Sequence, residues 1–261
     1  MACQYGQISG LARALACGLS LSGFALATPT KALADNGFEG FQHFAGTLNH
    51  VSTVEGAESH GALGLKLGLG ETVATLPGEE GLAKENFYEN ADGADAAVVM
   101  PTVMIVKGLS VPIDVALVTA FRDNRRVSQV AVVGQWTVFE RFTLPAVALR
   151  VGLSRFYGLA FAEIESAATD LVASYGVKVF TLYGTYGLGF HRATLHASPH
   201  GQAAFLAAGS TGEELKSACG ETTYGGGLRV TLFPPFLSLS FEARQGEGDT
   251  SLFAVKVGLG H

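Results

Sequence analysis

Isolated charged side chains within apolar segments are the residues of this chain best placed for chemistry. Lys66 is the single charge in "ALGLKLGLG", Arg150 is the single charge in "PAVALRVGLS", and "FLSLSFEAR" carries acid and base two positions apart. Groups of this kind can form ion pairs or attract a charged solute. The whole set that the pattern singles out is Lys66, Asp114, Arg150, Arg229, Glu242, Arg244 and Lys256.

The histidines raise two further hypotheses, a metal site and a catalytic site. "HRATLHASPH" places His191, His196 and His200 at spacings of five and four. Residues five apart on a strand face opposite sides, and no acid or cysteine sits in place to complete a metal site. His191 and Asp170 would be the pair for a barrel enzyme, although nothing in their spacing supports one. No glycine-rich phosphate loop, CxxC, HExxH or nucleophile elbow occurs, so we predict no catalytic, cofactor-binding or metal-ligating residues and expect no enzyme.

Alternation of period two indicates the elements that carry these charges. In "ALGLKLGLG" the leucines occupy one face and Lys66 with the glycines occupies the other, and "FLSLSFEAR" and "LRVTLF" repeat the pattern. The chain is 48% hydrophobic and only 15% charged, well below the charged share of ordinary soluble domains. Its net charge of −6 argues against nucleic acid as a partner.

These segments predict an all-β protein, an antiparallel transmembrane β-barrel over residues 61–261. A closed sheet satisfies every backbone polar group inside lipid, which explains how so apolar a chain avoids spanning helices. We count about ten strands within a range of 8–12, and charges on their lipid face would be costly, so the charged set above is predicted to line the lumen. The expected strands are 61–76, 97–108, 111–122, 127–139, 143–156, 160–176, 178–195, 222–233, 236–246 and 250–261.

The connections predict which end of the barrel faces outward. The longest, 77–96 and 197–221, follow odd-numbered strands, whereas the turns after strands two, six and eight are minimal. Outer-membrane barrels have long outside loops and short periplasmic turns, so we expect both termini in the periplasm. Aromatic residues near strand ends are typical of interfacial belts; they are Phe121, Trp136, Phe139, Phe142, Phe156, Tyr157, Phe190, Phe233 and Phe236.

Two N-terminal segments precede the predicted barrel. Residues 1–34 combine Arg13, an apolar run and Ala32-Leu33-Ala34, the pattern of a cleaved secretory signal peptide. Cleavage would leave Cys219 as the only cysteine and exclude a disulfide framework. Residues 35–60 contain a helical apolar spacing that predicts a short helix near Phe38–Val51. This segment could plug the barrel, sit in the periplasm, or be a frayed terminus.

The closing stretch "FAVKVGLGH" resembles the C-terminal signal of bacterial outer-membrane β-barrel proteins, although His261 stands where that family normally has an aromatic residue. The resemblance implies recognition of the last strand by the barrel-assembly machinery. Residues 143–261, with the "PAVALR" and "ASYG" strands and the final hairpin, are similar to a family of uncharacterised proteobacterial barrels. Some relatives of that type are grouped with porins and long-chain fatty acid transporters, which implies location more than activity.

The expected function is a narrow channel or carrier for small or hydrophobic solutes in the bacterial outer membrane, with outer-membrane lipids as partners. The alternative is a structural or surface-interaction barrel without transport. The lumen charges fit both, because they can pair across strands or present a positive excess that favours anions. The sequence indicates neither the solute nor an oligomeric state.

Overall fold

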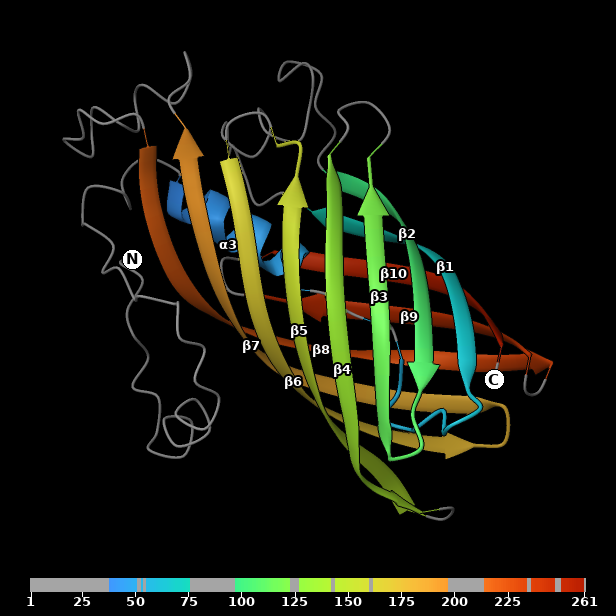
Figure 1. The fold of residues 1–261 in the computed structure, drawn as a ribbon. Helices are drawn as coiled ribbons and strands as arrows, with labels where there is room; N and C mark the ends of the chain where they lie inside the picture. Colours follow the sequence, from blue (N-terminus) through green and yellow to red (C-terminus); the bar gives the residue numbers. More distant parts are fainter. Residues whose placement is uncertain are drawn as a thin grey trace.

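Ten strands and one helix make up the part of the chain that the structure describes (Figure 1). The computed structural model describes residues 38–50, 53, 55–75, 97–122, 127–141, 144–159, 162–196, 214–233, 236–246 and 250–260. The elements are α3 (Phe38–Asn49), β1 (Leu65–Thr75), β2 (Ala97–Gly108), β3 (Ile113–Phe121), β4 (Ser128–Arg141), β5 (Leu144–Tyr157), β6 (Ala162–Val177), β7 (Phe180–His196), β8 (Glu214–Phe233), β9 (Leu237–Gln245) and β10 (Ser251–Gly260). The described helix is too short to cross a membrane.

The strands form one closed antiparallel barrel, in which each strand pairs with its neighbours in the sequence. β1 and β10 close the sheet, with Leu67 opposite Leu259 and Val73 opposite Phe253. The predicted ten-strand barrel is therefore confirmed. Closure leaves no unpaired strand edge, which is what a sheet needs in order to sit in lipid.

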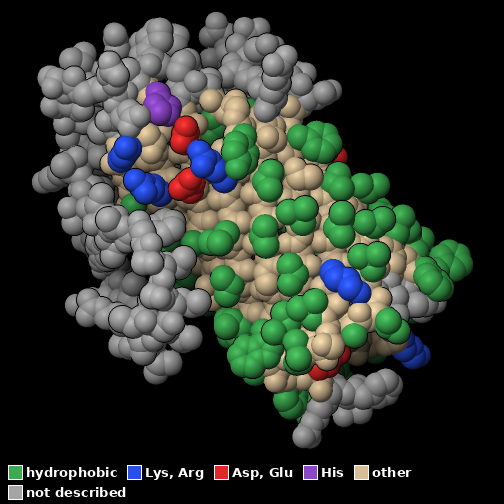
Figure 2. Space-filling model, viewed as in Figure 1, with side chains coloured by type: hydrophobic (Ala, Val, Ile, Leu, Met, Phe, Trp, Pro, Cys, Tyr) green, Lys and Arg blue, Asp and Glu red, His purple; other side chains and the backbone are tan. Residues whose placement is uncertain are grey.

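The wall alternates between an apolar outer face and a largely polar inner face. One outward row crosses six neighbouring strands through direct cross-strand pairs: Leu259, Leu67, Ile105, Leu117, Val132 and Leu153. Each of these side chains is about half exposed, and Figure 2 shows hydrophobic side chains spread over the visible wall. Exposure of such an apolar surface to water would cost free energy, whereas contact with lipid tails does not.

The two ends of the barrel differ in the length of their connections. Residues 76–96 and 197–213 join strands at one end, here called the long-loop end. Turns 109–112, 142–143, 178–179 and 234–236 lie at the other, the short-turn end, where β1 begins and β10 finishes. The predicted alternation of long and short connections is therefore present in the strand order.

Several sequence-based boundaries and orientations need correction. β8 begins at Glu214, so residues 214–221 belong to a strand and not to the predicted 197–221 loop. Phe156 is 2% exposed and points into the barrel, whereas the other described aromatics of the predicted belt face outward. The predicted signal peptide 1–34, the loop 77–96, Phe142 and His261 lie outside the described residues.

Candidate functional site in the barrel lumen

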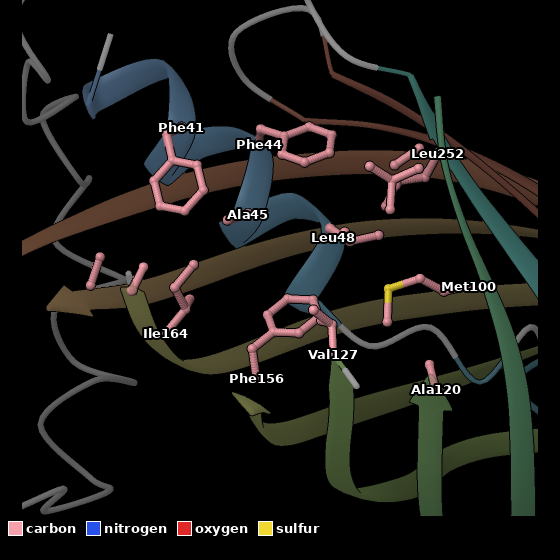
Figure 3. Packing of buried hydrophobic residues seen from close by; sticks show 14 of the residues in the cluster. Phe41, Phe44, Ala45, Leu48, Met100, Ala120, Val127, Phe156, Ile164 and Leu252 are labelled. Carbon is pink, nitrogen blue, oxygen red and sulfur yellow. The ribbon is translucent and has the colours of Figure 1, made fainter. Parts of the chain in front are cut away.

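Helix α3 lies inside the long-loop end of the barrel and seals it with apolar contacts. Phe41, Phe44, Ala45 and Leu48 are buried, and they pack against a ring of wall side chains near the ends of the strands (Figure 3). That ring includes Ala74, Val98, Met100, Ala120, Val127, Phe156, Ile164, Leu195 and Leu252. The predicted helix is thus present, and of the three places considered for it, the structure puts it in the lumen.

From α3 the chain descends through the lumen to the short-turn end, and the described part of residues 38–60 is here called the segment. Asn49 Nδ2 donates to Ser166 Oγ (2.7 Å) near the start of β6, and the Ala57 amide donates to Ser174 Oγ (3.0 Å) further along the same strand. His60 Nδ1 then lies 2.9 Å from Asp114 Oδ2 at the start of β3. The described segment therefore begins at the long-loop end, and the N-terminus, which was expected in the periplasm with the C-terminus, lies outside the described residues.

Wall side chains donate hydrogen bonds to backbone carbonyls of this segment from the end of α3 to Ala57. Arg150 Nη2 donates to the Glu55 carbonyl (3.0 Å), Thr137 Oγ1 to the Ala57 carbonyl (2.8 Å) and Lys256 Nζ to the Thr53 carbonyl (2.6 Å). Gln129, Ser154 and Gln135 donate to further carbonyls in the same way. An irregular chain buried in a barrel must find such partners for its carbonyls, and the inward polar residues supply them.

The Glu55 carboxylate is the electrostatic centre of the lumen. Lys66 Nζ lies 2.8 Å from Oε1, Arg229 Nη1 lies 3.3 Å from Oε2, and Lys256 Nζ also contacts Oε1. Burial alone would raise the pKa of the Glu55 carboxyl, but the charges of Lys256, Lys66 and Arg229 outweigh it and hold the pKa well below its usual range. Glu55 is therefore ionised although its side chain is buried.

A second charged group joins the segment to β6 and β9. His50 Nε2 lies 2.7 Å from Asp170 Oδ1, and Arg244 Nη2 lies 3.7 Å from Asp170 Oδ2 and 3.3 Å from Glu242 Oε1. Burial lowers the pKa of the His50 imidazole below its ordinary value; Asp170 opposes this and Arg244 adds to it. His50 is therefore a neutral hydrogen-bonding group at neutral pH.

His191 does not meet Asp170, the partner considered for it from the sequence. His191 Nδ1 lies 2.8 Å from Ser166 Oγ, and its Nε2 lies 3.2 Å from Glu221 Oε2. Thr47 of α3 also donates to Glu221. A hydroxyl, an imidazole and a carboxylate thus lie in series, but α3 covers all three. In this closed arrangement they fix the helix to β6, β7 and β8.

The seven residues predicted to line the lumen all have their side chains inside the barrel. Three of them, Lys66, Arg229 and Lys256, converge on Glu55. Glu242 pairs with Arg244, and Asp114 contacts His60. The positive excess, one of the two alternatives for these charges, does not hold within the described residues, because Asp170, Glu221, Glu55 and Glu58 also face the lumen. In the part of the lumen that the structure describes, six acids (Asp114, Asp170, Glu221, Glu242, Glu55 and Glu58) face five bases (Lys66, Arg150, Arg229, Arg244 and Lys256).

Two small cavities lie between the segment and the side of the barrel formed by β1, β2 and β10. Their volumes are about 30 and 20 Å³, and both are lined by Thr72, Thr102 and Ala254. Each volume suits one or two water molecules and nothing larger. No cluster of three metal-ligating side chains occurs within the described ranges.

No family model and no curated protein matches the chain. Solved structures with a similar fold include Ail, the attachment invasion locus protein of Yersinia pestis, at 16% identity over 79% of this chain and 98% of that one, with a TM-score of 0.29. The N-terminal β-barrel domain of OprF from Pseudomonas aeruginosa is 10% identical over 75% and 97%, with a TM-score of 0.32. The KdgM porin is 9% identical over 74% and 98%, with a TM-score of 0.37. At these values the likenesses carry no argument about function.

The class of the protein follows from its own geometry. Its strands form a closed sheet, its outer face is apolar, and its two longest connections lie at the same end. These three features together are those of outer-membrane barrels. The chain is an outer-membrane β-barrel.

Proposed function

We propose that this barrel is a gated narrow pore for small polar solutes, held closed by its own residues 38–60. The observation that carries the proposal is that a separate segment fills the lumen together with the inward side chains of the wall. The described segment is bound to the wall by hydrogen bonds, ion pairs and apolar contacts, all of which can break and re-form. In small barrels without such a segment, the side chains of the wall fill the interior.

The inner wall also offers more polar groups than the segment uses. Within the described residues, the buried hydroxyls of Thr185, Ser217, Thr223, Ser238 and Ser240 have no hydrogen-bond partner in the protein. Buried polar groups are normally paired with protein or water. A hydroxyl-lined wall supports a lumen that is hydrated when the segment withdraws, which suits polar solutes better than hydrophobic ones.

The alternative is a closed barrel without transport, and one observation favours it. The buried charges of the wall and the segment neutralise one another closely, as a permanent structural core would require. The gated pore and the closed structural barrel differ in whether the segment leaves the lumen while the barrel stays folded. Neither hypothesis includes a catalytic step.

Conductance in planar bilayers separates them. The pore predicts brief, infrequent openings of the wild-type protein and a higher open fraction for Glu55→Ala, because that change removes the main charge that holds the segment. Glu140→Ala is the matched control, since Glu140 contacts the segment at the exposed short-turn end only. If neither the wild type nor Glu55→Ala passed current while both remained folded, the closed structural barrel would be the correct reading.

A further inference from the structure

We propose that Lys66, Arg229 and Lys256 form a binding site for small carboxylates, which the side chain of Glu55 occupies in the closed barrel. The proposal rests on the gated-pore function and names the solute class that this site would select. In this view Glu55 is a built-in ligand. Its withdrawal exposes the site to an anion entering the lumen.

The geometry is that of a built anion site. Three basic side chains from β1, β8 and β10 meet at one carboxylate, with Lys66 Nζ 2.8 Å from Oε1, Arg229 Nη1 3.3 Å from Oε2, and Lys256 Nζ in contact with Oε1. Lys66 and Lys256 are 4% exposed and Glu55 is 3% exposed. Arrangement of several cations around both oxygens is the way proteins recognise carboxylates strongly.

The counter-charges of these cations come from the segment and not from the wall. Within the described residues, each ion pair of Lys66, Arg229 and Lys256 goes to Glu55 or Glu58. The wall acids are engaged elsewhere: Asp114 contacts His60, Asp170 and Glu242 lie beside Arg244, and Glu221 lies beside His191. When the segment leaves, three neighbouring cations lose their counter-charge, which is costly unless an anion replaces it.

Glycines in β1 and β10 leave room for the two lysine side chains. A Cβ at Gly68 would lie 3.0 Å from Lys256 Cδ, and a Cβ at Gly258 would lie 3.1 Å from Lys66 Nζ. A larger residue at either position would press against the lysine side chain that reaches the carboxylate. The space for these two lysine side chains is therefore provided by the wall strands themselves.

Chemical rescue tests the site. Glu55→Ala removes the carboxylate and leaves its place open to acetate or formate. We expect either anion to raise the unfolding temperature of Glu55→Ala, with a steady gain per tenfold increase in concentration, because ligand binding stabilises the folded state by mass action. Chloride at equal ionic strength and neutral acetamide should give a much smaller gain. Equal effects of acetate, chloride and acetamide would overturn the proposal.

Two further variants test whether the acetate-dependent gain in unfolding temperature comes from this site. Glu55→Ala combined with Lys66→Gln and Lys256→Gln should lose the acetate-dependent gain, whereas Asp170→Ala, which removes another buried lumen acid, should show none. If Glu55→Ala does not assemble, its refolding yield in detergent with acetate and with acetamide gives the same comparison. A several-fold higher yield with acetate supports the site, and equal yields contradict it.

The rescue experiment tests the carboxylate site separately from the pore. Acetate rescue without any current from the folded protein would keep the carboxylate site and refute the pore. Current from Glu55→Ala without acetate rescue, and without a preference for anions in a salt gradient, would keep the pore and refute the site.

Discussion

Glu55 of the N-terminal segment is bound inside the barrel by Lys256 of the last strand, 201 residues later in the sequence. The same lysine also donates to the backbone carbonyl of Thr53. The strand that closes the sheet against β1 thus also holds the segment that closes the lumen. Barrel closure and lumen closure are therefore linked through one side chain.

Acid should loosen the segment through Glu55. The folded-state pKa of its carboxyl lies well below the ordinary value of 4.5, so its contribution to stability is fully present above that value. The contribution is lost as pH falls below 4.5 towards the folded-state pKa. The measurement is the unfolding free energy, or the open fraction in bilayers, as a function of pH. Glu55→Gln should remove this part of the pH dependence, and an unchanged profile in that variant would contradict the assignment.

His50 should act in a separate pH range. Its folded-state pKa is lowered from 6.5, chiefly by burial, so protonation favours states in which the imidazole is exposed. Its contribution is full above 6.5 and declines as pH falls from there towards the folded-state pKa. Asp170, Arg244 and His191 are the charged or titratable groups that affect it most. His50→Gln should flatten the profile just below 6.5 and leave the Glu55 range unchanged; a loss of both ranges together would be inconsistent with this account.

Arg150 should matter far more than a neighbouring arginine of the same strand. Arg150→Ala removes donors to Gln135 Oε1 (2.8 Å) and to the Glu55 carbonyl (3.0 Å) in the buried lumen. Leaving such buried acceptors unpaired costs about 1–3 kcal/mol each, so we expect a loss of at least about 2 kcal/mol. Arg155→Ala is the control, because Arg155 pairs with Glu163 on the outer wall where both are partly exposed. That loss should stay below about 1 kcal/mol. Equal losses by urea unfolding would argue against the lumen assignment.

The outward row of apolar residues should tolerate no charge at mid-depth. Leu117 faces outward in β3 with Ile105 and Val132 beside it. Leu117→Arg should destabilise the barrel in lipid by about 2–4 kcal/mol, the cost of an arginine near the midplane. Leu63→Arg, at a fully exposed position near the short-turn end, should cost about 1 kcal/mol or less. The contrast is measured by unfolding in lipid vesicles, and its absence would mean that this row does not face lipid.

Much of the wall could be predicted from the sequence because a two-residue period has only two faces to assign. The period puts Lys66 and Glu242 on the inward face for that reason. It predicts too late a start for β8, because the first part of that strand, "ELKSACGE", has no apolar outward face: Lys216, Ala218 and Gly220 alternate with buried Ser217 and Cys219. In this barrel, alternation of hydrophobicity therefore marks only the strand segments whose outward face is apolar.

The site itself could not be read from the sequence. Residues 50–60 follow neither helical nor strand periodicity, so no pattern points Glu55 at any partner. Its three cations come from strands that the chain brings together only when the barrel closes. The pairing of His191 with Glu221 likewise depends on the long β7–β8 register, which places Cys219 directly opposite His191.

A reversible lock on the segment tests the gated pore most directly. A Cβ at Gly46 of α3 would lie 2.7 Å from Cγ of His191. The two Cβ atoms are thus at most about 4.2 Å apart, which is close enough for a disulfide after small adjustments of the helix. The variant Gly46→Cys, His191→Cys, with Cys219→Ser, can therefore link α3 to β7, and the link can be verified by the gel mobility of the oxidised and reduced chain.

Bilayer conductance of this variant should depend on the redox state. The account predicts no openings when the disulfide is formed and openings that return when a reductant is added, while Cys219→Ser alone is insensitive to the reductant. Equal currents in the oxidised and reduced states would show that the segment does not gate the lumen. Absence of current in both states, from folded protein, would show that the barrel is not a pore.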